Sequence, residues 1–197
     1  MARLCFFLQI ACAALIYSTC LAQQSHDGLT TITGIGWSSC DEDNLPGKVE
    51  SLTMSPNPLS IPGSVNISKT FVTSETLVSP IKIIFKVEMK VKSERSKIKW
   101  IHVPCFEYFG SCTINNACGL LDSLFKVGNP CPAPLSTNNI PCHCPFNAGT
   151  YTLPVTSFDI SDAEWLQMVP KGTYRSSVIV YSGHQKISCT VYEFELK

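Results

Sequence analysis

The sequence predicts an all-β fold: a single antiparallel domain, shaped as a β-sandwich or β-cup, with one short helix and several disulfides. Apolar and polar residues alternate along several short segments, which is typical of strands that bury one face of a sheet. Turn signals rich in Pro and Gly separate these segments, and many short strands of this kind favour an antiparallel arrangement. The chain also holds 11 cysteines, most densely between Cys105 and Cys144, which predicts a stapled loop region.

The N-terminus predicts export. A basic start precedes an apolar run over residues 4–16, and Ala22 ends a segment of the kind that a signal peptidase cleaves. The run is too short for a transmembrane helix, which needs about 20 apolar residues. We therefore predict a signal peptide at residues 1–22, a flexible leader at 23–36 and one domain at 37–197. The secretory pathway, with the lysosome or the outside of the cell as its end, is the expected location.

Export decides how the cysteines are interpreted. Cleavage removes three of the 11 cysteines and leaves eight, an even number that suits four disulfides. Exported cysteines usually pair with one another. The run Cys142-His143-Cys144 lacks the second pair of ligands that a zinc site needs, so we predict no metal. Eight cysteines allow roughly a hundred pairings, and the spacing alone leaves the connectivity open.

The first two strand candidates are Val49–Met54 and Val65–Thr73. In the second, apolar residues such as Ile67 and Phe71 alternate with polar ones, so the two kinds of side chain point to opposite faces. Asn66 begins a glycosylation sequon and falls on the polar face, where a glycan would stand in solvent. We therefore predict an N-linked glycan at Asn66.

Ile81–Lys92 is the clearest strand, with apolar residues at every second position and mostly Lys or Glu between them. After a turn, Lys97–Val103 returns as its partner strand and carries Trp100. Seven Lys and Arg residues lie within residues 82–99, although the whole chain has a formal net charge of +0. This hairpin is either a solvated outer face or a basic patch for an anionic membrane or an acidic partner. The patch candidates are Lys92, Arg95, Lys97 and Lys99. The neutral overall charge gives no reason to expect binding of nucleic acid.

The only good helix candidate is Cys118–Phe125, within the stapled region. The remaining strand candidates are Thr150–Leu153, Val155–Ile160, Tyr174–Tyr181 and Lys186–Leu196, of which the last two form a closing hairpin. Between the strands, residues 163–170 hold several large apolar side chains but show no clean period.

No local signature of catalysis or of cofactor binding is present in the sequence. The chain contains no G-x-S-x-G elbow, no H-E-x-x-H motif, no phosphate loop and no dinucleotide-binding glycine pattern. A Ser-His-Asp triad leaves no local trace, because its members lie far apart in the chain. We nevertheless favour a protein that is not an enzyme and carries no cofactor.

Several motifs stand in the order found in one known family. They include Trp37-x-x-Cys40-Asp41-Glu42, Ile61-Pro62-Gly63, Val103-Pro104-Cys105, Gly110-Ser111-Cys112, Pro130-Cys131-Pro132, Pro141-Cys142-His143-Cys144-Pro145-Phe146 and Gly172-x-Tyr174-Arg175. Together they resemble the GM2 ganglioside activators, lysosomal lipid-transfer proteins of the ML-type lipid-recognition group. The resemblance covers nearly all of the mature chain. The loop at residues 92–97 is short and apolar in the family but longer and polar here, so the chain resembles a diverged member.

The resemblance implies a β-cup with an apolar cavity, which extracts a glycosphingolipid from membranes and presents it to lysosomal β-hexosaminidase A. It also implies the disulfides Cys40–Cys189, Cys105–Cys112, Cys118–Cys144 and Cys131–Cys142. The alternatives are a carrier of another lipid in the same group, a secreted lipid-acting hydrolase, and a disulfide-rich interaction module.

A lipid carrier needs an apolar lining and an apolar rim. The cavity candidates are Ile83, Phe85, Val87, Met89, Val91, Tyr192, Phe194 and Leu196, and the alternative for each is an ordinary core position. The rim candidates are Trp100, Trp165, Leu166, Met168 and Val169, because large apolar side chains on an irregular loop suit a surface that meets lipid. The alternative for Trp165 is a plug beneath the loop.

Overall fold

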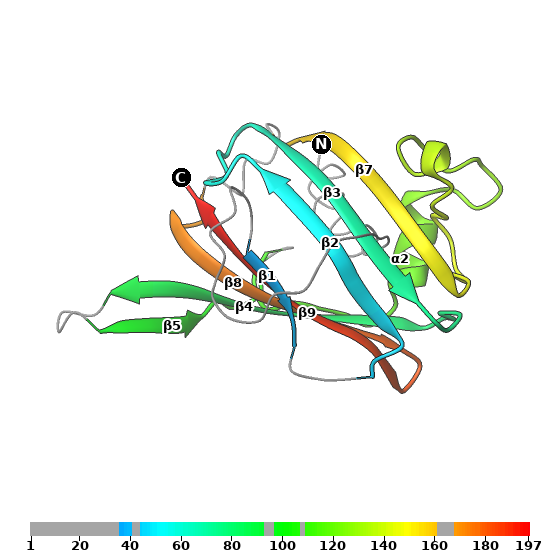
Figure 1. Ribbon diagram of the computed structural model, residues 1–197, viewed down its shortest axis with the longest axis horizontal. Coiled ribbons are helices and arrows are strands. Elements are labelled where there is room, and N and C mark those ends of the chain that lie inside the picture. Colours follow the sequence, from blue (N-terminus) through cyan, green and yellow to red (C-terminus); the bar gives the residue numbers. More distant parts are fainter. Residues whose placement is uncertain (1–35, 41–43, 93–96, 107–108, 161–167) are drawn as a thin grey trace.

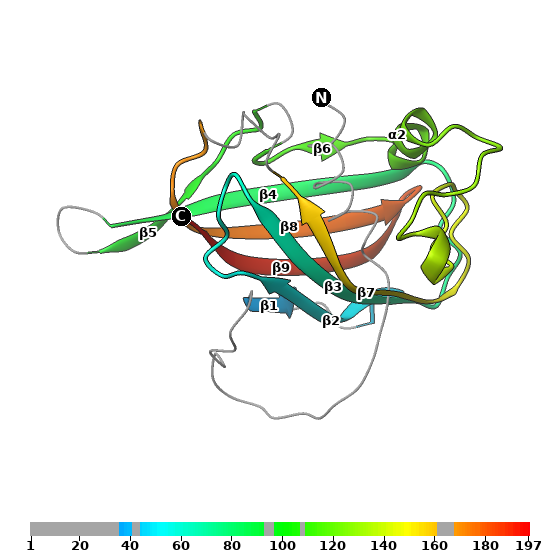
Figure 2. The same ribbon diagram turned by 90° about the horizontal axis from the view of Figure 1, so that it is seen from above.

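The computed structural model describes residues 36–40, 44–92, 97–106, 109–160 and 168–197. Two antiparallel sheets lie face to face in a cup-like arrangement, with the smaller sheet over the larger one (Figures 1 and 2). The predicted all-β fold with one short helix and four disulfides is therefore confirmed.

The larger sheet has six strands. Five of them follow the order β1 (Gly36–Ser39), β9 (Gln185–Leu196), β8 (Gly172–Ser182), β4 (Ile81–Lys92) and β5 (Ile98–His102), and β6 (Thr113–Ile114) also pairs with β4. The bounds of β4 are those that its alternating pattern predicts. The closing hairpin of β8 and β9 is also confirmed, and it places the C-terminal strand in the interior of the sheet, between β8 and β1.

The smaller sheet consists of β2 (Gly47–Ser55), β3 (Ser64–Thr73) and β7 (Gly149–Asp159), with β3 in the middle. The prediction of two separate strands between Thr150 and Ile160 was wrong, because β7 runs without interruption. Its pairing with β3 shifts at Pro154, where two residues of β7 stand opposite one residue of β3. Proline has no backbone N–H to donate to a neighbouring strand, so this position suits a bulge within a strand.

Helix α2 (Ala117–Leu124) begins one residue before its predicted start. Asn116 caps it, since its side-chain oxygen accepts a hydrogen bond from the N–H of Gly119 at 3.1 Å. Leu121 is buried under the helix, whereas Asp122 is exposed. A single 3-10 turn, η1 (Ser136–Asn138), follows in the stapled region.

Four disulfides join the elements, and they are the four pairs that the resemblance implies. Cys40–Cys189 spans 149 residues and ties the start of the domain to β9. The other three are Cys105–Cys112, Cys118–Cys144 and Cys131–Cys142, with separations of 7, 26 and 11 residues. These three shape the region between β5 and β7, where Pro and Gly residues are many and β6, α2 and η1 are short.

The main hydrophobic core lies between the inner faces of the two sheets. Strand β3 contributes Ile67 and Phe71, and β4 contributes its alternate residues from Ile81 to Val87. A second, smaller cluster joins the stapled region to β7 through Leu135, Ile140, Cys142 and Leu153. The core therefore lies on the face of each sheet that the two-residue period of the sequence predicts to be buried.

Candidate functional site

The eight predicted cavity residues share one face of the larger sheet and point toward the smaller sheet. The strand register shows that they project on the same side, because Val87 on β4 pairs with Ser176 on β8, and Ser176 pairs with Tyr192 on β9. Directly opposed residues of an antiparallel pair project on the same side. Four of the eight are buried, namely Ile83, Phe85, Val87 and Leu196. The other four, Met89, Val91, Tyr192 and Phe194, are only half-buried.

An aromatic cluster occupies one end of this inner face. Tyr174 is fully buried, stacks on Phe194 with ring centroids 5.7 Å apart, and meets the ring of Phe109 edge-on at 5.7 Å. Its hydroxyl donates a hydrogen bond to the carbonyl oxygen of Pro170. Burial raises the pKa of the Tyr174 phenol above its usual value, so the side chain stays neutral and remains a donor.

The inner face is not wholly apolar. Lys69 on β3 is 3% exposed, and its Nζ donates a hydrogen bond of 3.0 Å to the hydroxyl of Tyr192 on the other sheet. This contact was not predicted from the sequence. The signal was present, because Lys69 stands two residues from both Ile67 and Phe71 and therefore shares their inward face.

The ends of β4 and β5 project from the two sheets as an arm (Figures 1 and 2). We call residues 88–92 and 97–102 the arm, and the structure describes all of them. Its inner face continues the apolar face of β4, because the pairs Met89–Ile101 and Val91–Lys99 project on that side. Its outer face carries the pairs Lys90–Trp100 and Lys92–Ile98.

Trp100 lies on the outer face of the arm, opposite to the face on which Met89 and Val91 project. The guanidinium carbon of Arg175 lies 4.5 Å from the centroid of its ring, and Lys90 Nζ lies 5.8 Å from it. Arg175 also donates to Glu88 Oε2 from Nη2 at 2.7 Å and from Nε at 3.1 Å. The ring is therefore held against two cations at the base of the arm.

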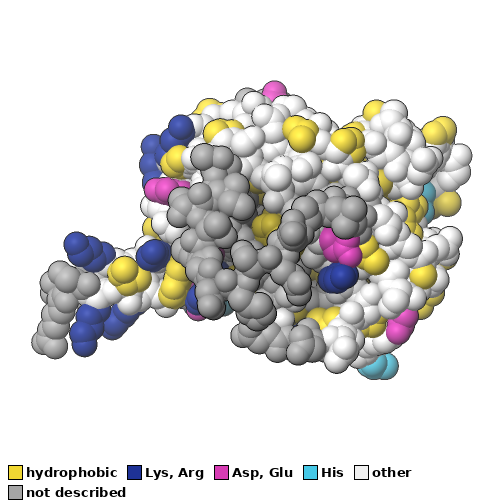
Figure 3. Space-filling view, in the orientation of Figure 1, with side chains coloured by type: hydrophobic (Ala, Val, Ile, Leu, Met, Phe, Trp, Pro, Cys, Tyr) yellow, Lys and Arg dark blue, Asp and Glu magenta, His cyan; other side chains and the backbone are white. Residues whose placement is uncertain are grey.

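The arm combines basic and apolar side chains on its surface (Figure 3). Ile98 is 62% exposed and Ile101 is 46% exposed. Three of the four patch candidates, Lys92, Lys97 and Lys99, are exposed around them. The fourth, Arg95, lies outside the described residues.

Two of the predicted rim residues on the loop after β7 are described. Met168 is 67% exposed, whereas Val169 is half-buried and packs against the main core. Trp165 and Leu166 lie outside the described residues. Met168 is thus the described loop residue that is best placed to meet a lipid surface.

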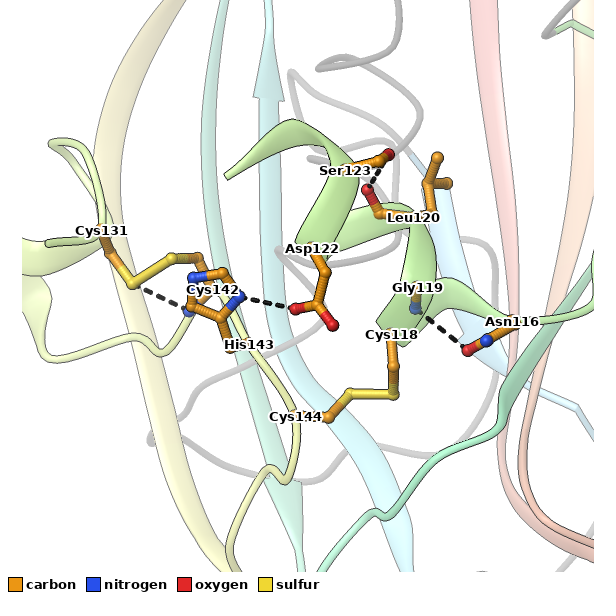
Figure 4. Close-up of polar contacts among 10 residues, drawn as sticks. All are labelled: Asn116, Cys118, Gly119, Leu120, Asp122, Ser123, Cys131, Cys142, His143 and Cys144. Carbon is orange, nitrogen blue, oxygen red and sulfur yellow. Dashed lines mark hydrogen bonds and ion pairs between the residues drawn. A yellow bond between two sulfur atoms is a disulfide. The ribbon is translucent and has the colours of Figure 1, made fainter. Parts of the chain in front are cut away.

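The run Cys142-His143-Cys144 has a structural role. Both cysteines are in disulfides, so neither offers a thiolate to a metal ion. His143 Nδ1 lies 2.7 Å from Oδ1 of Asp122, which joins this run to helix α2 (Figure 4). Among the described residues, no three His, Cys, Asp or Glu side chains gather as a metal site.

His102 also has a structural contact. Its Nδ1 lies 3.2 Å from the hydroxyl of Ser111. The same hydroxyl accepts from the backbone N–H of Val87 at 2.9 Å and lies 3.2 Å from the Val87 carbonyl oxygen. Ser111 therefore fastens the loop that Cys105–Cys112 closes to β4, and His102 contacts the same hydroxyl.

Asn66 is half-buried on the outer face of the smaller sheet, where it pairs with Ser55 on β2 and Ser157 on β7. A glycan at this position would point away from Lys69 and the core. The glycan stays a prediction.

No helix in the described part of the chain is long and apolar enough to cross a bilayer.

Comparison with known proteins places this architecture in a family. The model of the ML domain matches residues 34–196. The protein named Ganglioside GM2 activator from Mus musculus is 38% identical over 169 residues, which cover 86% of this chain and 85% of that protein. Its namesake from Macaca fascicularis is 38% identical over 174 residues, or 88% of each. A structure of a Niemann-Pick type C2 protein from the Japanese carpenter ant aligns over 82% of this chain and 99% of that chain, with a TM-score of 0.41 and 13% identity. The family match and the identity to the two mammalian proteins show that this chain belongs to the ML domain family.

Proposed function

We propose that this protein is a lipid-transfer protein without catalytic activity, which extracts a glycosphingolipid similar to GM2 ganglioside from membranes and presents it to β-hexosaminidase A. The observation that carries the proposal is 38% identity, across more than four-fifths of the chain, to two proteins named Ganglioside GM2 activator. The predicted signal peptide and the four disulfides support a site of action in the secretory pathway or the lysosome.

The inner faces of the two sheets suit the acyl chains of such a lipid. Each CH₂ group that leaves water for an apolar interior contributes about 0.8 kcal/mol, so an apolar cup offsets extraction from the bilayer. The half-buried residues Met89, Val91 and Phe194 are the best lining candidates, because an ordinary core would bury them completely. Met89, Val91 and Ile101 extend this apolar surface along the inner face of the arm.

The arm is proposed to meet the membrane. Each Lys or Arg near an anionic bilayer contributes about 1 kcal/mol of attraction. Lys92, Lys97 and Lys99 supply such charges, and the exposed side chains of Ile98 and Ile101 lie among them. Apolar residues surrounded by cations bind at the boundary between headgroups and acyl chains. Met168, with the predicted rim residues Trp165 and Leu166, would add a second contact with lipid.

The proposal is tested by hydrolysis of GM2 ganglioside held in vesicles. Purified β-hexosaminidase A is given these vesicles with and without the secreted protein, and a water-soluble substrate serves as the control. We expect the protein to raise hydrolysis of the vesicle-bound lipid several-fold and to leave the soluble substrate unaffected. Transfer of lipid between vesicles without faster hydrolysis would show that the enzyme partner is wrong. Neither transfer nor activation would contradict the proposal as a whole.

A further inference from the structure

The inner face of β4 opens gradually from the core toward the arm. Its inward residues from Ile83 to Val87 are buried, whereas the next two, Met89 and Val91, are half-buried. The two half-buried residues belong to the part of β4 that projects beyond the sheets (Figure 1). This apolar surface therefore has a direction, with a buried end between the sheets and an open end on the arm.

Strand β5 adds a cation to the open end of this surface. Ile101, the register partner of Met89, is apolar and yet 46% exposed. Lys99, the register partner of Val91, is exposed. Directly opposed residues of an antiparallel pair project on the same side, so Lys99 shares the inner face with these apolar residues. The inner face is thus apolar where it is buried and basic where it meets water.

The length of this face suits one acyl chain. A strand rises about 3.3 Å per residue, so the stretch from Phe85 to Val91 is about 20 Å long. The hydrocarbon core of a bilayer is about 30 Å thick, so the tail of a lipid in one leaflet occupies about 15 Å. A lipid whose tail lies on the buried end therefore has its headgroup at the arm, beside Lys99.

The inner face of the described part of the arm has no carboxylate. Glu88, the acidic residue of that part, projects on the outer face and binds Arg175 at 2.7 Å. A carboxylate or phosphate of a bound lipid would accept a hydrogen bond from the Lys99 ammonium, and such bonds are stronger than those between neutral groups. Lys99 is therefore placed to favour lipids with an acidic headgroup.

We propose that Lys99 binds the acidic headgroup of the lipid whose acyl chain lies along the inner face of β4. The inference rests on the proposed lipid-binding function and names the class of lipid that binds best, one with a carboxylate or phosphate in its headgroup. It also separates the two faces of the arm. Lys99 contacts the bound lipid as well as the membrane, whereas Lys92 on the outer face contacts the membrane alone.

The arm supplies a matched control for this division. Lys92 pairs with Ile98, and Lys99 belongs to the adjacent register pair, with Val91. Both lysines are exposed, but they project on opposite faces of the same hairpin. Lys99→Gln and Lys92→Gln therefore remove the same charge at nearly the same place along the arm and differ in the face that loses it.

Binding of matched lipids to the secreted protein, in solution without vesicles, tests this inference. Lysophosphatidate with an oleoyl chain and monooleoylglycerol share the chain and the glycerol, and they differ by the phosphate. Each is titrated against a bound fluorescent lipid. Inorganic phosphate tests a free anion without a chain. Binding of each variant to vesicles of phosphatidylserine and phosphatidylcholine is measured separately.

We expect the unmodified protein to bind lysophosphatidate about threefold to fivefold more tightly than monooleoylglycerol, which is the effect of one ion pair at a surface. Lys99→Gln should lower this ratio at least about twofold and retain affinity for monooleoylglycerol, which also shows that the variant is folded. Lys92→Gln should retain the ratio. Both variants should bind the anionic vesicles more weakly, and by a similar factor.

Three results would overturn the inference. The first is equal binding of the two lipids by the unmodified protein, and the second is a ratio that Lys99→Gln lowers no more than Lys92→Gln does. In both, binding of monooleoylglycerol would leave the proposed lipid-transfer function intact, whereas binding of neither lipid would contradict both proposals. The third is binding of inorganic phosphate alone, lost in Lys99→Gln, which would assign the site to a free anion in place of a lipid.

Discussion

Arg175 on β8 lies over the ring of Trp100 on β5, with 4.5 Å between its guanidinium carbon and the ring centroid. Strands β8 and β5 are not neighbours, since β4 runs between them. The same guanidinium binds Glu88 on β4 at 2.7 Å, so one side chain links three strands at the base of the arm. The arm is therefore a braced extension of the larger sheet.

Replacing Arg175 by Met should loosen the arm more than it destabilises the domain. The Glu88 side chain of this ion pair is more than a third exposed, so the pair contributes little to stability. We expect that losing the ion pair and the ring contact together lowers the free energy of unfolding by about 1 kcal/mol or less. For a domain of this size, that lowers the melting temperature by no more than about 4 °C. Hydrogen exchange should become faster at Ile98–His102. Lys48→Met, which removes the ion pair of the exposed Lys48 with Glu50, is the control. Unchanged exchange in β5 would show that Arg175 does not brace the arm.

Removing charge from the arm should weaken binding to anionic vesicles specifically. Lys92, Lys97 and Lys99 replaced together by Ser should lower lipid transfer from acidic vesicles and spare transfer from neutral ones. Added salt should have the same effect on the unmodified protein, because exposed charges are screened beyond roughly 8 Å at physiological ionic strength.

The matched control for this prediction changes three exposed lysines that lie outside the arm. Lys48, Lys86 and Lys126 replaced by Ser alter the net charge by the same amount. If both triple variants lose transfer equally, net charge rather than the arm governs membrane binding. If neither loses transfer, the arm is an ordinary solvated hairpin.

Met168→Ser should reduce vesicle binding and lipid transfer without changing the melting temperature. Met168 is 67% exposed, so its removal leaves no cavity in the core, whereas a membrane contact would be lost. Val155→Ser is the control, because Val155 is 72% exposed on β7, away from the loop after that strand. A fall in melting temperature for Met168→Ser, with transfer unchanged, would show that this residue supports the fold instead.

Tyr174 should titrate later than an ordinary tyrosine. Burial raises the pKa of its phenol above the usual value near 10. Because the neutral form is favoured in the folded state, this stabilisation is complete below the ordinary pKa and is lost as the pH rises through the folded-state pKa. Ultraviolet absorbance of tyrosinate should show a late step that Tyr174→Phe removes. Tyr151, whose pKa burial also raises, should still titrate late in that variant.

The long disulfide should matter more for stability than the short ones. In the chain-entropy model, closing the 149-residue loop of Cys40–Cys189 stabilises the domain by about 5 kcal/mol, against about 2 kcal/mol for the 7-residue loop of Cys105–Cys112. Thermal melting of the two double Cys→Ser variants measures the difference. A larger loss from the short loop would mean that its local contacts, including that of Ser111 with β4, dominate its effect.

Local patterns predicted the elements well wherever burial of one face decided the structure. The alternation of apolar and polar residues predicted the bounds of β4. It also predicted that Ile83, Phe85 and Val87 share the inner face, where they are buried. It failed at Pro154, because a bulge allows β7 to continue past a residue that cannot donate to its neighbour.

Contacts between distant segments were less accessible from the sequence. Lys69 was not assigned to the inner face, since a lysine in a strand is usually exposed. Its partner Tyr192 is 123 residues away on the other sheet, and no spacing rule connects the two. In the same way, no spacing rule predicted that Trp100 lies against Arg175 of β8, and its predicted place at a lipid rim stays a prediction. The predicted roles of Trp165 and Leu166 concern residues outside those that the structure describes.

Identification of the lipid that copurifies with the secreted protein, by mass spectrometry under non-denaturing and then denaturing conditions, tests the central claim most directly. A transfer protein should carry about one lipid per chain, and a glycosphingolipid with an acidic group should dominate when such lipids are supplied. The lipid should pass to acceptor vesicles unchanged in mass. A protein that carries no lipid after exposure to such membranes, or that releases a hydrolysed product, would contradict the account.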